Sequence, residues 1–331
     1  MTQLDIVICT YNRAADLQAC LAALAAQRGA NEGWRVTVVD NNSTDATPGV
    51  VAAWAARDSP PGLRRIVERT QGLTPARLRG IRESVADWVA FVDDDCIVAP
   101  DWVAEALRFA AAHPEAGAFG GRVLPDWGVP PPPHLKRHGW LFAEQAYGDA
   151  PRMVGNLVGA GVVLNRRALA AVGWTRKPYL ADRTGVGHVS GGDVEIGCRL
   201  AAGGYPLWYA PGLRIDHRVA PARQRMRQLL GLARGLGAGA ELVSLMGAPD
   251  PEAWPDRVRR QLREEIRRHV ASTRYVINGR YPWQDWLIRA AFLAGQRQQH
   301  RILSRDAATR KRLGGLWGDP NREARTENPS P

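Results

Sequence analysis

The first hundred residues alternate apolar runs rich in β-branched side chains with alanine-rich segments of helical period. This alternation is typical of βαβ units, so it predicts an α/β fold with a mainly parallel twisted sheet flanked by helices. The predicted strands are Leu4–Cys9, Arg35–Val39, Leu63–Glu68 and Trp88–Val92. The predicted helices between them cover residues 14–27, 46–57 and 74–85.

Polar clusters follow three of these strands. They are Thr10-Tyr11-Asn12, Asp40-Asn41-Asn42 and Asp93-Asp94-Asp95. Because ligands of open α/β sheets bind at the carboxyl ends of the strands, we expect the binding site at this edge. Asn12 and Ser43 also stand where a helix N-cap would accept backbone hydrogen bonds.

The pattern becomes mixed beyond Asp101. A helix to His113 and a strand over residues 117–123 are predicted, and a proline run at 129–133 then favours extended, semi-rigid backbone. An apolar run with glycines, a glycine-rich loop, a helix and a strand follow, at residues 153–164, 184–192, 193–202 and 207–210.

After His217 the chain reads as arginine-rich helices. Between Trp254 and Val270 apolar residues recur every four positions and arginines fill the remaining circumference, which predicts a basic amphipathic helix. We assign residues 218–306 to this basic helical region. Residues 307–331 are polar and contain proline and glycine, so we expect a poorly ordered tail.

The net charge of +11 belongs to the C-terminal third. Residues 218–331 hold 22 Lys+Arg against 11 Asp+Glu, whereas residues 1–217 hold 22 of each. This asymmetry indicates a basic appendage that meets an anionic surface, either phospholipid headgroups or nucleic acid.

Several features favour a cytoplasmic protein. The four cysteines show neither the close spacing of a zinc site nor the density of a disulfide framework. The N-terminus enters a strand-like run without the pattern of a signal peptide. Arg234 and Arg289 interrupt the longest apolar stretches, so we expect no segment with the roughly 18 apolar residues of a membrane span.

Asp93, Asp94 and Asp95 present three adjacent carboxylates at a strand end. Their mutual repulsion calls for a positive partner, and a hard divalent cation, Mg²⁺ or Mn²⁺, prefers such oxygen ligands and keeps places for substrate phosphates. A solvated acidic turn is the alternative. The position at the end of a buried strand favours the metal site.

Three other residues are candidates for chemistry. Asp40 ends the second strand and could accept hydrogen bonds from a base or ribose. Asp193 follows two glycines at the start of a helix, whose N-terminus favours an anion; it is either an N-cap or a general base. His217 is either a structural histidine or a further ligand to the cation, and the sequence leaves both readings open.

These residues lie in an ordered set of motifs that resembles the inverting family 2 glycosyltransferases of GT-A fold. The resemblance covers residues 4–217. The matching pieces are Ile8-Cys9-Thr10-Tyr11-Asn12-Arg13, Val39–Asp45, Gly72–Arg77, Phe91–Asp95, Gly120-Gly121-Arg122, Gly192–Glu195 with Arg199-Leu200, and Tyr209–His217.

The resemblance implies a role for each matched residue. Asp95 would be the more direct metal ligand, with Asp93 nearer the ribose and His217 completing the metal shell. Asp193 would be the catalytic base. The implied nucleotide-sugar contacts are Thr10, Tyr11, Arg13, Asp40, Arg77, Asp93 and Asp94. Residues 1–100 would form the nucleotide-binding half of the domain and residues 101–217 the acceptor-side half.

The function that follows is transfer of a sugar, with inversion, from a nucleotide-sugar to an acceptor hydroxyl. We expect a UDP-sugar donor and a saccharide, lipid-linked saccharide or small molecule as acceptor. Leu78 and Gly192 depart from the family pattern, which usually has Asn and Glu there. One alternative is therefore a nucleotide-sugar-binding module without turnover.

A second alternative is nucleic-acid binding through the arginine-rich region, which we do not favour. The stripe from Trp254 to Val270 also suggests peripheral contact with the inner face of the cytoplasmic membrane, next to a lipid-linked acceptor. Docking of the stripe onto the catalytic domain is the other possibility. The stripe is narrow, so we favour docking.

Overall fold

A computed structural model of the chain describes residues 3–30, 32–57, 59–179 and 191–315. These residues form two compact units, each of which is described by itself. Within the described ranges, the first unit contains residues 3–130, 142–179 and 192–219. The second contains residues 131–141, Gly191 and residues 220–315. Most of the predicted glycine-rich loop, at residues 184–190, lies outside the described residues.

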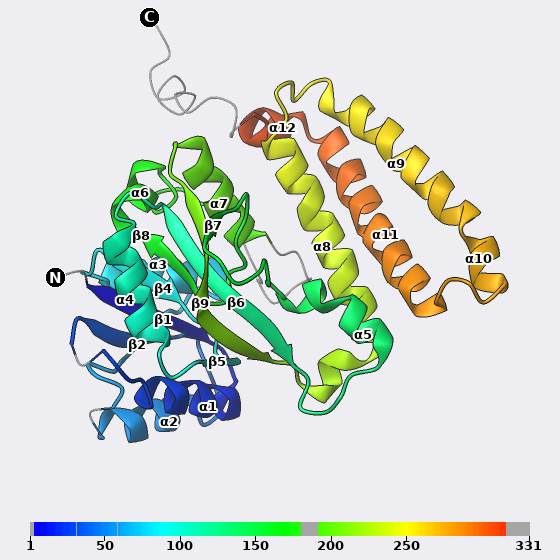
Figure 1. The fold of residues 1–331 in the computed structure, drawn as a ribbon. Helices are drawn as coiled ribbons and strands as arrows, with labels where there is room; N and C mark the ends of the chain where they lie inside the picture. Colours follow the sequence, from blue (N-terminus) through cyan, green and yellow to red (C-terminus); the bar gives the residue numbers. More distant parts are fainter. Residues whose placement is uncertain (1–2, 31, 58, 180–190, 316–331) are drawn as a thin grey trace, which may run out of the picture. The chain divides into compact units, whose positions relative to one another are not determined.

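The first unit is built on a nine-stranded sheet in the order β3-β2-β1-β4-β8-β6-β9-β5, with β7 paired to β9 (Figure 1). Strands β1 to β4 pair in parallel, and β8 runs antiparallel to both β4 and β6. The strands are β1 Leu4–Thr10, β2 Trp34–Asp40, β3 Arg64–Val67, β4 Trp88–Phe91, β5 Cys96–Val98, β6 Ala118–Asp126, β7 Arg152–Met153, β8 Val162–Asn165 and β9 Leu207–Arg218.

Helices follow the strands as the sequence predicts. The helices of the first unit are α1 Ala14–Ala25, α2 Thr47–Ala55, α3 Leu73–Glu83, α4 Trp102–Ala112, α6 Arg166–Ala171 and α7 Gly192–Ala202. The predicted α/β class is confirmed, and the elements of the first hundred residues end within a few residues of their predicted bounds. The main difference is β9, which continues to Arg218 because it pairs with β5, β6 and β7.

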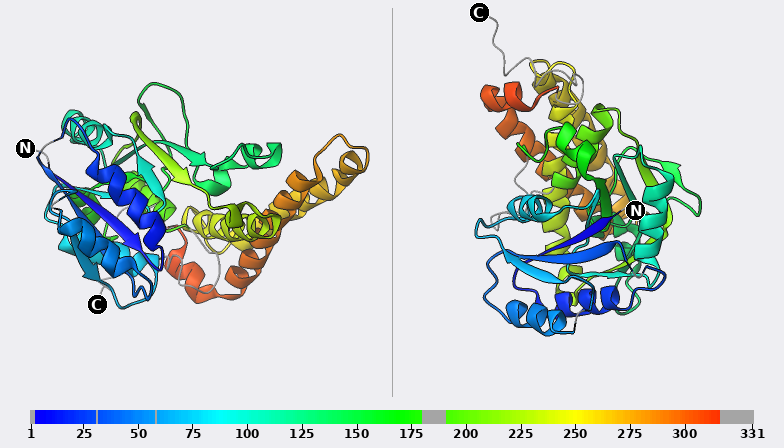
Figure 2. Two further views of the ribbon diagram at one scale, coloured as in Figure 1. Left: turned by 90° about the horizontal axis from the view of Figure 1, so that it is seen from below. Right: turned by 90° about the vertical axis from the view of Figure 1, so that its left-hand side faces the viewer.

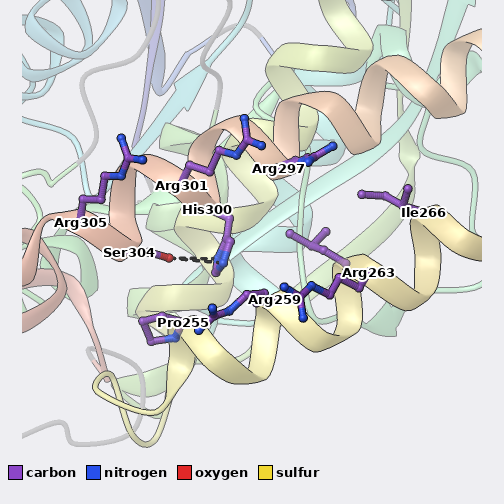
Figure 3. Close-up of a pocket in the computed structure, with 10 residues that line it drawn as sticks. Pro255, Arg259, Arg263, Ile266, Arg297, His300, Arg301, Ser304 and Arg305 are labelled. Carbon is purple, nitrogen blue, oxygen red and sulfur yellow. Dashed lines mark hydrogen bonds between the residues drawn. The ribbon is translucent and has the colours of Figure 1, made fainter.

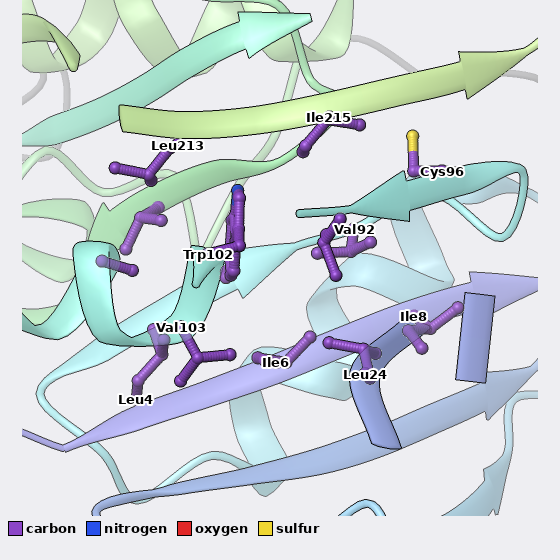
Figure 4. Packing of buried hydrophobic residues seen from close by; sticks show 14 of the residues in the cluster. Leu4, Ile6, Ile8, Leu24, Val92, Cys96, Trp102, Val103, Leu213 and Ile215 are labelled. Atoms are coloured by element: carbon purple, nitrogen blue, oxygen red, sulfur yellow. The ribbon is translucent and has the colours of Figure 1, made fainter. Parts of the chain in front are cut away.

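Strand β1 is buried on both faces, which explains its unbroken apolar run. Ile6 and Ile8 point into one core, where Leu24 of α1 and Trp102 of α4 also lie (Figure 4). Val7 points to the opposite face and packs in a second core with residues of α3 and α7. The alternation of side chains along a strand thus places one strand between two helical layers.

The predicted N-caps at Asn12 and Ser43 are wrong. Asn12 Oδ1 accepts a hydrogen bond from the Thr44 amide at 2.7 Å, and Ser43 Oγ accepts one from the Asn12 amide at 3.0 Å. The first amide of α1, at Ala14, donates to Asp45 at 3.1 Å instead. Because β1 and β2 are neighbours, their loops meet, and partners from the adjacent loop replace local capping.

The second unit is helical. Its α-helices are α5 Pro133–Arg137, α8 Met226–Met246, α9 Trp254–Ala271, α10 Thr273–Ile277, α11 Trp283–Arg305 and α12 Ala307–Leu313. Its 3-10 helices are η1 Gly139–Phe142 and η2 Pro221–Gln224. Phe142, the last residue of η1, belongs to the first unit. Helix α11 packs against both α8 and α9. Gly237 of α8 and Gly295 of α11 allow the two backbones to touch, since a Cβ at either would overlap a carbonyl of the facing helix.

Two expectations for this region need correction. Helix α8 is long and apolar enough to cross a membrane by length and composition, because its single interior arginine does not lower the mean hydropathy sufficiently. Half of that apolar window is buried in the protein, and a core helix of a bundle has the same composition. In addition, residues 307–313 of the expected disordered tail form α12, in which Arg310 and Leu313 are buried.

The amphipathic helix predicted from Trp254 to Val270 is confirmed as α9, and its stripe divides in two. Trp254, Val258 and Leu262 are buried against the rest of the helical unit. Val270, at the other end of the stripe, is 61% exposed. The expected docking of the stripe onto the catalytic domain is therefore corrected, because Trp254 contacts Ser244 of α8 and His300 of α11 and most of the stripe serves the packing of the helical unit.

A carboxylic acid lies between α8 and α11. Glu241 is 3% exposed, and its Oε1 accepts a hydrogen bond from Gln296 Nε2 at 3.0 Å. Among the described residues, Glu241 Oε2 has no hydrogen-bond partner. Burial raises the pKa of Glu241 to about 7, and the nearby Glu265 acts in the same direction. The group therefore favours its neutral form in the folded chain.

This raised pKa predicts that stability falls as the pH rises from about 4.5 to about 7, because the unfolded chain loses the proton of Glu241 before the folded chain does. Glu241→Gln has no proton to lose at this position. As the pH rises over this range, the free energy of unfolding of the variant should therefore increase by roughly 1–3 kcal/mol relative to that of the parent. Urea unfolding of both proteins at a series of pH values measures it. Parallel stability profiles would contradict the assignment.

Candidate active site

Three loops meet at the carboxyl ends of parallel strands in the first unit. Thr10 ends β1, Asp40 ends β2, and Asp93 to Asp95 follow β4. Since β1 pairs with β2 on one side and β4 on the other, the three polar clusters lie along one edge of the sheet. The sequence predicted this edge as the binding site.

Asp94 and Asp95 are buried, at 5% and 3% exposure, and both pair with Arg13 from the loop after β1. Arg13 Nη1 lies 3.2 Å from Asp94 Oδ1, and Nη2 lies 3.0 Å from Asp95 Oδ2. The Thr10 hydroxyl donates to Asp94 Oδ2 at 2.7 Å. Both carboxylate oxygens of Asp94 thus face groups of β1 and its loop, and Asp95 shares Arg13 with Asp94.

The pKa values reflect this crowding. Burial raises the pKa of Asp94 to about 7, against the opposing effect of Arg13, and the charge of Asp95 adds to the rise. Burial alone would lower the pKa of Arg13, but the charges of Asp94 and Asp95 outweigh it and raise that pKa. Arg13 therefore remains charged and offsets part of the repulsion within the turn.

His217 joins the turn from the other end of the domain. Strand β9 pairs antiparallel with β5 and sets His217 opposite Cys96, the residue after Asp95. His217 Nδ1 donates to the Phe142 carbonyl at 2.7 Å, and Nε2 lies 3.3 Å from Asp95 Oδ1. Burial would lower the pKa of His217, but the hydrogen bond and charge of Asp95 outweigh it and raise that pKa.

The donor set suits a hard divalent cation. A histidine that ligates a metal usually donates its second ring N–H to a carbonyl or carboxylate, as His217 does to Phe142. Its Nε2 and the Asp95 carboxylate then converge. Within the described ranges, no three His, Cys, Asp or Glu side chains form a complete metal site. The residues present fit a cation that takes part of its shell from water or phosphate oxygens.

A second layer of charges supports Arg13. Asp16 lies 2.9 Å from Arg13 Nη2 and 3.2 Å from Arg218 Nη1, and the Arg218 amide donates to the Asp95 carbonyl at 2.9 Å. The sequence analysis missed both Asp16 and Arg218. The spacing of three residues between Arg13 and Asp16 at the start of a helix could have indicated their ion pair. No local pattern in the sequence indicates the contact of Arg218 with Asp16.

Asp40 is fully buried and both of its carboxylate oxygens have partners. Oδ1 accepts from the Ser43 amide at 2.8 Å, and Oδ2 accepts from Arg65 Nε and Nη2 at 2.9 and 2.6 Å. The contact of Asp40 with a nucleotide stays a prediction. Arg65, on the neighbouring strand β3, is a partner that the sequence analysis missed.

Asn41 fastens the loop after β3 to the end of β2. Its Nδ2 donates to the carbonyls of Glu68 and Thr70 at 2.8 and 2.7 Å, and its Oδ1 accepts from the Gly72 amide at 2.7 Å. Gly72 has a φ of 135°, which favours glycine, and precedes α3. This anchoring positions the first turn of α3, from which Arg77 extends.

Asp193 is the second residue of α7 and has a fixed orientation. Its Oδ2 accepts from the Gly159 amide at 3.0 Å and its Oδ1 from the Val194 amide at 3.0 Å. Asp193 and the buried Arg77, whose guanidinium lies over the Phe91 ring, line one small cavity. Tyr11, in contrast, is 48% exposed on the loop after β1. Their functional roles stay predictions.

The other carboxylate of α7 is structural. Glu195 is fully buried, lies 3.0 Å from Arg199 Nε, and accepts a hydrogen bond from the Tyr179 amide at 2.9 Å. A fully buried carboxylate that pairs with a buried arginine fits a structural role. Of the two acidic residues in the first turn of α7, Asp193 is therefore the candidate base.

The family model described as Glycosyl transferase family 2 matches residues 5–172, just over half of the chain. The chain belongs to glycosyltransferase family 2. The matched region includes β1, β2, β4 and the acidic turn, and β9 with His217 lies beyond it. The family predicted from the motifs is thus confirmed.

Curated relatives of this family 2 glycosyltransferase have different acceptors in their names. It is 26% identical to the glucosyl-dolichyl phosphate glucuronosyltransferase of Haloferax volcanii over 57% of this chain and 60% of that protein. It is 31% identical to the validoxylamine A glucosyltransferase of Streptomyces hygroscopicus subsp. jinggangensis over 62% of this chain and 52% of that protein. The chain thus spans about half to three-fifths of these relatives' length.

A solved structure supports the fold. The mannosyltransferase PcManGT from Pyrobaculum calidifontis, in complex with GDP-Man and Mn²⁺, matches 90% of this chain and 86% of its own. The TM-score is 0.59 and the sequence identity is 19%. The predicted GT-A fold of the family 2 glycosyltransferase is confirmed by this similarity.

The pairing of Asp40 with Arg65 predicts that Arg65→Met destabilises the protein by about 1–2 kcal/mol, because it leaves a buried carboxylate without its arginine partner. Arg69→Met is the matched control, since Arg69 forms no ion pair within the described residues. Urea unfolding of both variants measures the difference. Equal stabilities would show that the pair does not contribute.

Proposed function

We propose that the protein transfers a sugar from a nucleotide-sugar to an acceptor hydroxyl with inversion, assisted by a divalent cation. The observation that carries the proposal is the meeting of Asp95 and His217 beside Asp93, at the carboxyl ends of the parallel strands of a family 2 chain. The Mn²⁺ in the PcManGT structure supports the choice of cation.

Asp95 and His217 would hold the cation, with Asp93 beside them, and the cation would neutralise the diphosphate that leaves. Arg13 pairs with both Asp94 and Asp95, which offsets part of the negative charge of the turn. The Phe142 carbonyl orients His217. These contacts preorganise the turn, so that little rearrangement accompanies donor binding.

Asp193 would act as the general base. The amides of Gly159 and Val194 each donate to one of its oxygens, which fixes the orientation of the side chain. As the acceptor oxygen bonds to the anomeric carbon and the bond from that carbon to the diphosphate breaks, the hydroxyl proton passes to Asp193. Attack opposite the leaving group inverts the anomeric centre.

The relatives and the motifs bear on the identities of donor and acceptor. A UDP-sugar is the donor expected from the motifs, whereas the PcManGT structure contains GDP-Man. The names of the relatives favour a lipid-linked saccharide or a small polar molecule as acceptor. A cytoplasmic location suits such a donor, and we retain it as part of the proposal.

Asp95→Asn tests the metal site. The variant should lose Mn²⁺-dependent release of nucleoside diphosphate from a panel of nucleotide-sugars by at least about 10²-fold, because a neutral amide is a poor ligand for a hard cation. Asp101→Asn, which changes a half-exposed carboxylate beyond the same turn, should retain activity. Turnover by the Asp95→Asn variant at the parental rate would rule out this metal site, and no turnover by the parent would favour a binding module.

Asp193→Asn tests the base. The variant should bind the nucleotide-sugar with parental affinity, measured by calorimetry, and lose transfer by about 10²–10⁴-fold. Asp87→Asn, at an exposed loop before β4, is the control that should leave both quantities unchanged. Undiminished transfer by the Asp193→Asn variant would eliminate Asp193 as the base without affecting the metal assignment.

A further inference from the structure

The tip of the second unit is the segment of residues 266–284, which contains the end of α9, the short helix α10 and the start of α11. Helices α9 and α11 form a hairpin, and α10 joins their ends (Figures 1 and 2). All residues of the tip are among those the structure describes.

The tip exposes large apolar side chains at short intervals. Ile277 is 78% exposed, Val270 61%, Trp283 53% and Tyr275 40%. Single exposed apolar residues are common on protein surfaces, but four within fourteen residues on one hairpin end are a concentrated feature. A partner that removes them from water would gain hydrophobic free energy.

The charge of the tip has one sign. Residues 266–284 contain four arginines and no aspartate or glutamate. Arg267 and Arg268 pair with Glu264 just outside the tip, and Arg274 lies over the Tyr275 ring at 4.7 Å. Arg280 forms no ion pair within the described part of the chain. The partner of this surface should therefore be anionic as well as apolar.

The same hairpin carries a second group of arginines around a cavity of about 530 Å³ between α9 and α11 (Figure 3). They form two rows with helical spacing, Arg259 and Arg263 on α9 and Arg297, Arg301 and Arg305 on α11. Within the described residues, only Arg259 has an acidic partner, Asp256. Rows of like charge repel each other, and anions relieve that repulsion.

We propose that the α9–α11 hairpin docks on an anionic phospholipid bilayer, with the apolar side chains of the tip entering the headgroup region. Tryptophan and tyrosine favour that region, and each arginine near an anionic surface adds about 1 kcal/mol of attraction. The arginine rows beside the cavity continue the positive charge of the hairpin away from the tip. This surface is independent of the proposed sugar transfer.

The features of the tip exclude two other partners. Nucleic acid would attract the arginines but would not account for the exposed Ile277 and Val270. A second copy of the chain could cover the apolar side chains, but two tips of equal positive charge would repel each other. The buried part of the α9 stripe, from Trp254 to Leu262, is also unavailable to a membrane. The tip therefore replaces the stripe as the membrane surface.

Vesicle flotation of the full chain tests the proposal. The protein should float with phosphatidylcholine vesicles that contain phosphatidylglycerol, float weakly with phosphatidylcholine alone, and bind less at high salt. The variant Ile277→Asp/Trp283→Asp should lose at least about tenfold in affinity for the anionic vesicles, since it removes two inserting side chains and adds two negative charges.

The matched control is Val85→Asp/Val129→Asp, which changes two equally exposed apolar residues of the first unit and the same net charge. It should float like the parent, and circular dichroism should show both double variants folded. Equal flotation of the two variants, or no flotation of the parent with anionic vesicles, would overturn the proposal. So would a tip variant that alters only the oligomeric state or only DNA binding.

Discussion

The central constraint on this protein is the burial of carboxylates at Asp94 and Asp95 next to Asp93. Three adjacent acids at the end of a buried strand repel one another, and low exposure strengthens that repulsion. Arg13 and His217 reduce it from two directions, and burial still raises the pKa of Asp94 to about 7. The loop after β1 and the end of strand β9 bring Arg13 and His217 to the turn.

The sheet topology makes this arrangement possible. Arg13 follows β1, which pairs directly with β4, so a short loop is sufficient to reach the turn. His217 is more than a hundred residues away and arrives because β9 pairs with β5 immediately after the acidic residues. Asp193 is held separately by the amides of Gly159 and Val194. The proposed metal site and the proposed base are thus supported by different elements.

The helical unit is held together by close packing of its helices. Glycines at 237 and 295 bring α8 and α11 into backbone contact, and the first half of the α9 stripe completes the packing. At the tip of the hairpin Val270, Ile277 and Trp283 remain more than half exposed. Arginines without acidic partners are tolerated there because water, or an anionic surface, solvates them.

The sequence by itself determined the α/β class, most elements of the first domain, the family and the acidic turn, because apolar periodicity and short motifs are local properties. It did not reveal the cross-links of Asn12 and Ser43, the pairing of Asp40 with Arg65, or the role of Asp16 and Arg218. Those interactions join segments that only become neighbours when strands pair. For the same reason, the tertiary structure alone decided that His217 lies beside Asp95 and that the apolar surface of α9 is divided between a buried stripe and an exposed tip.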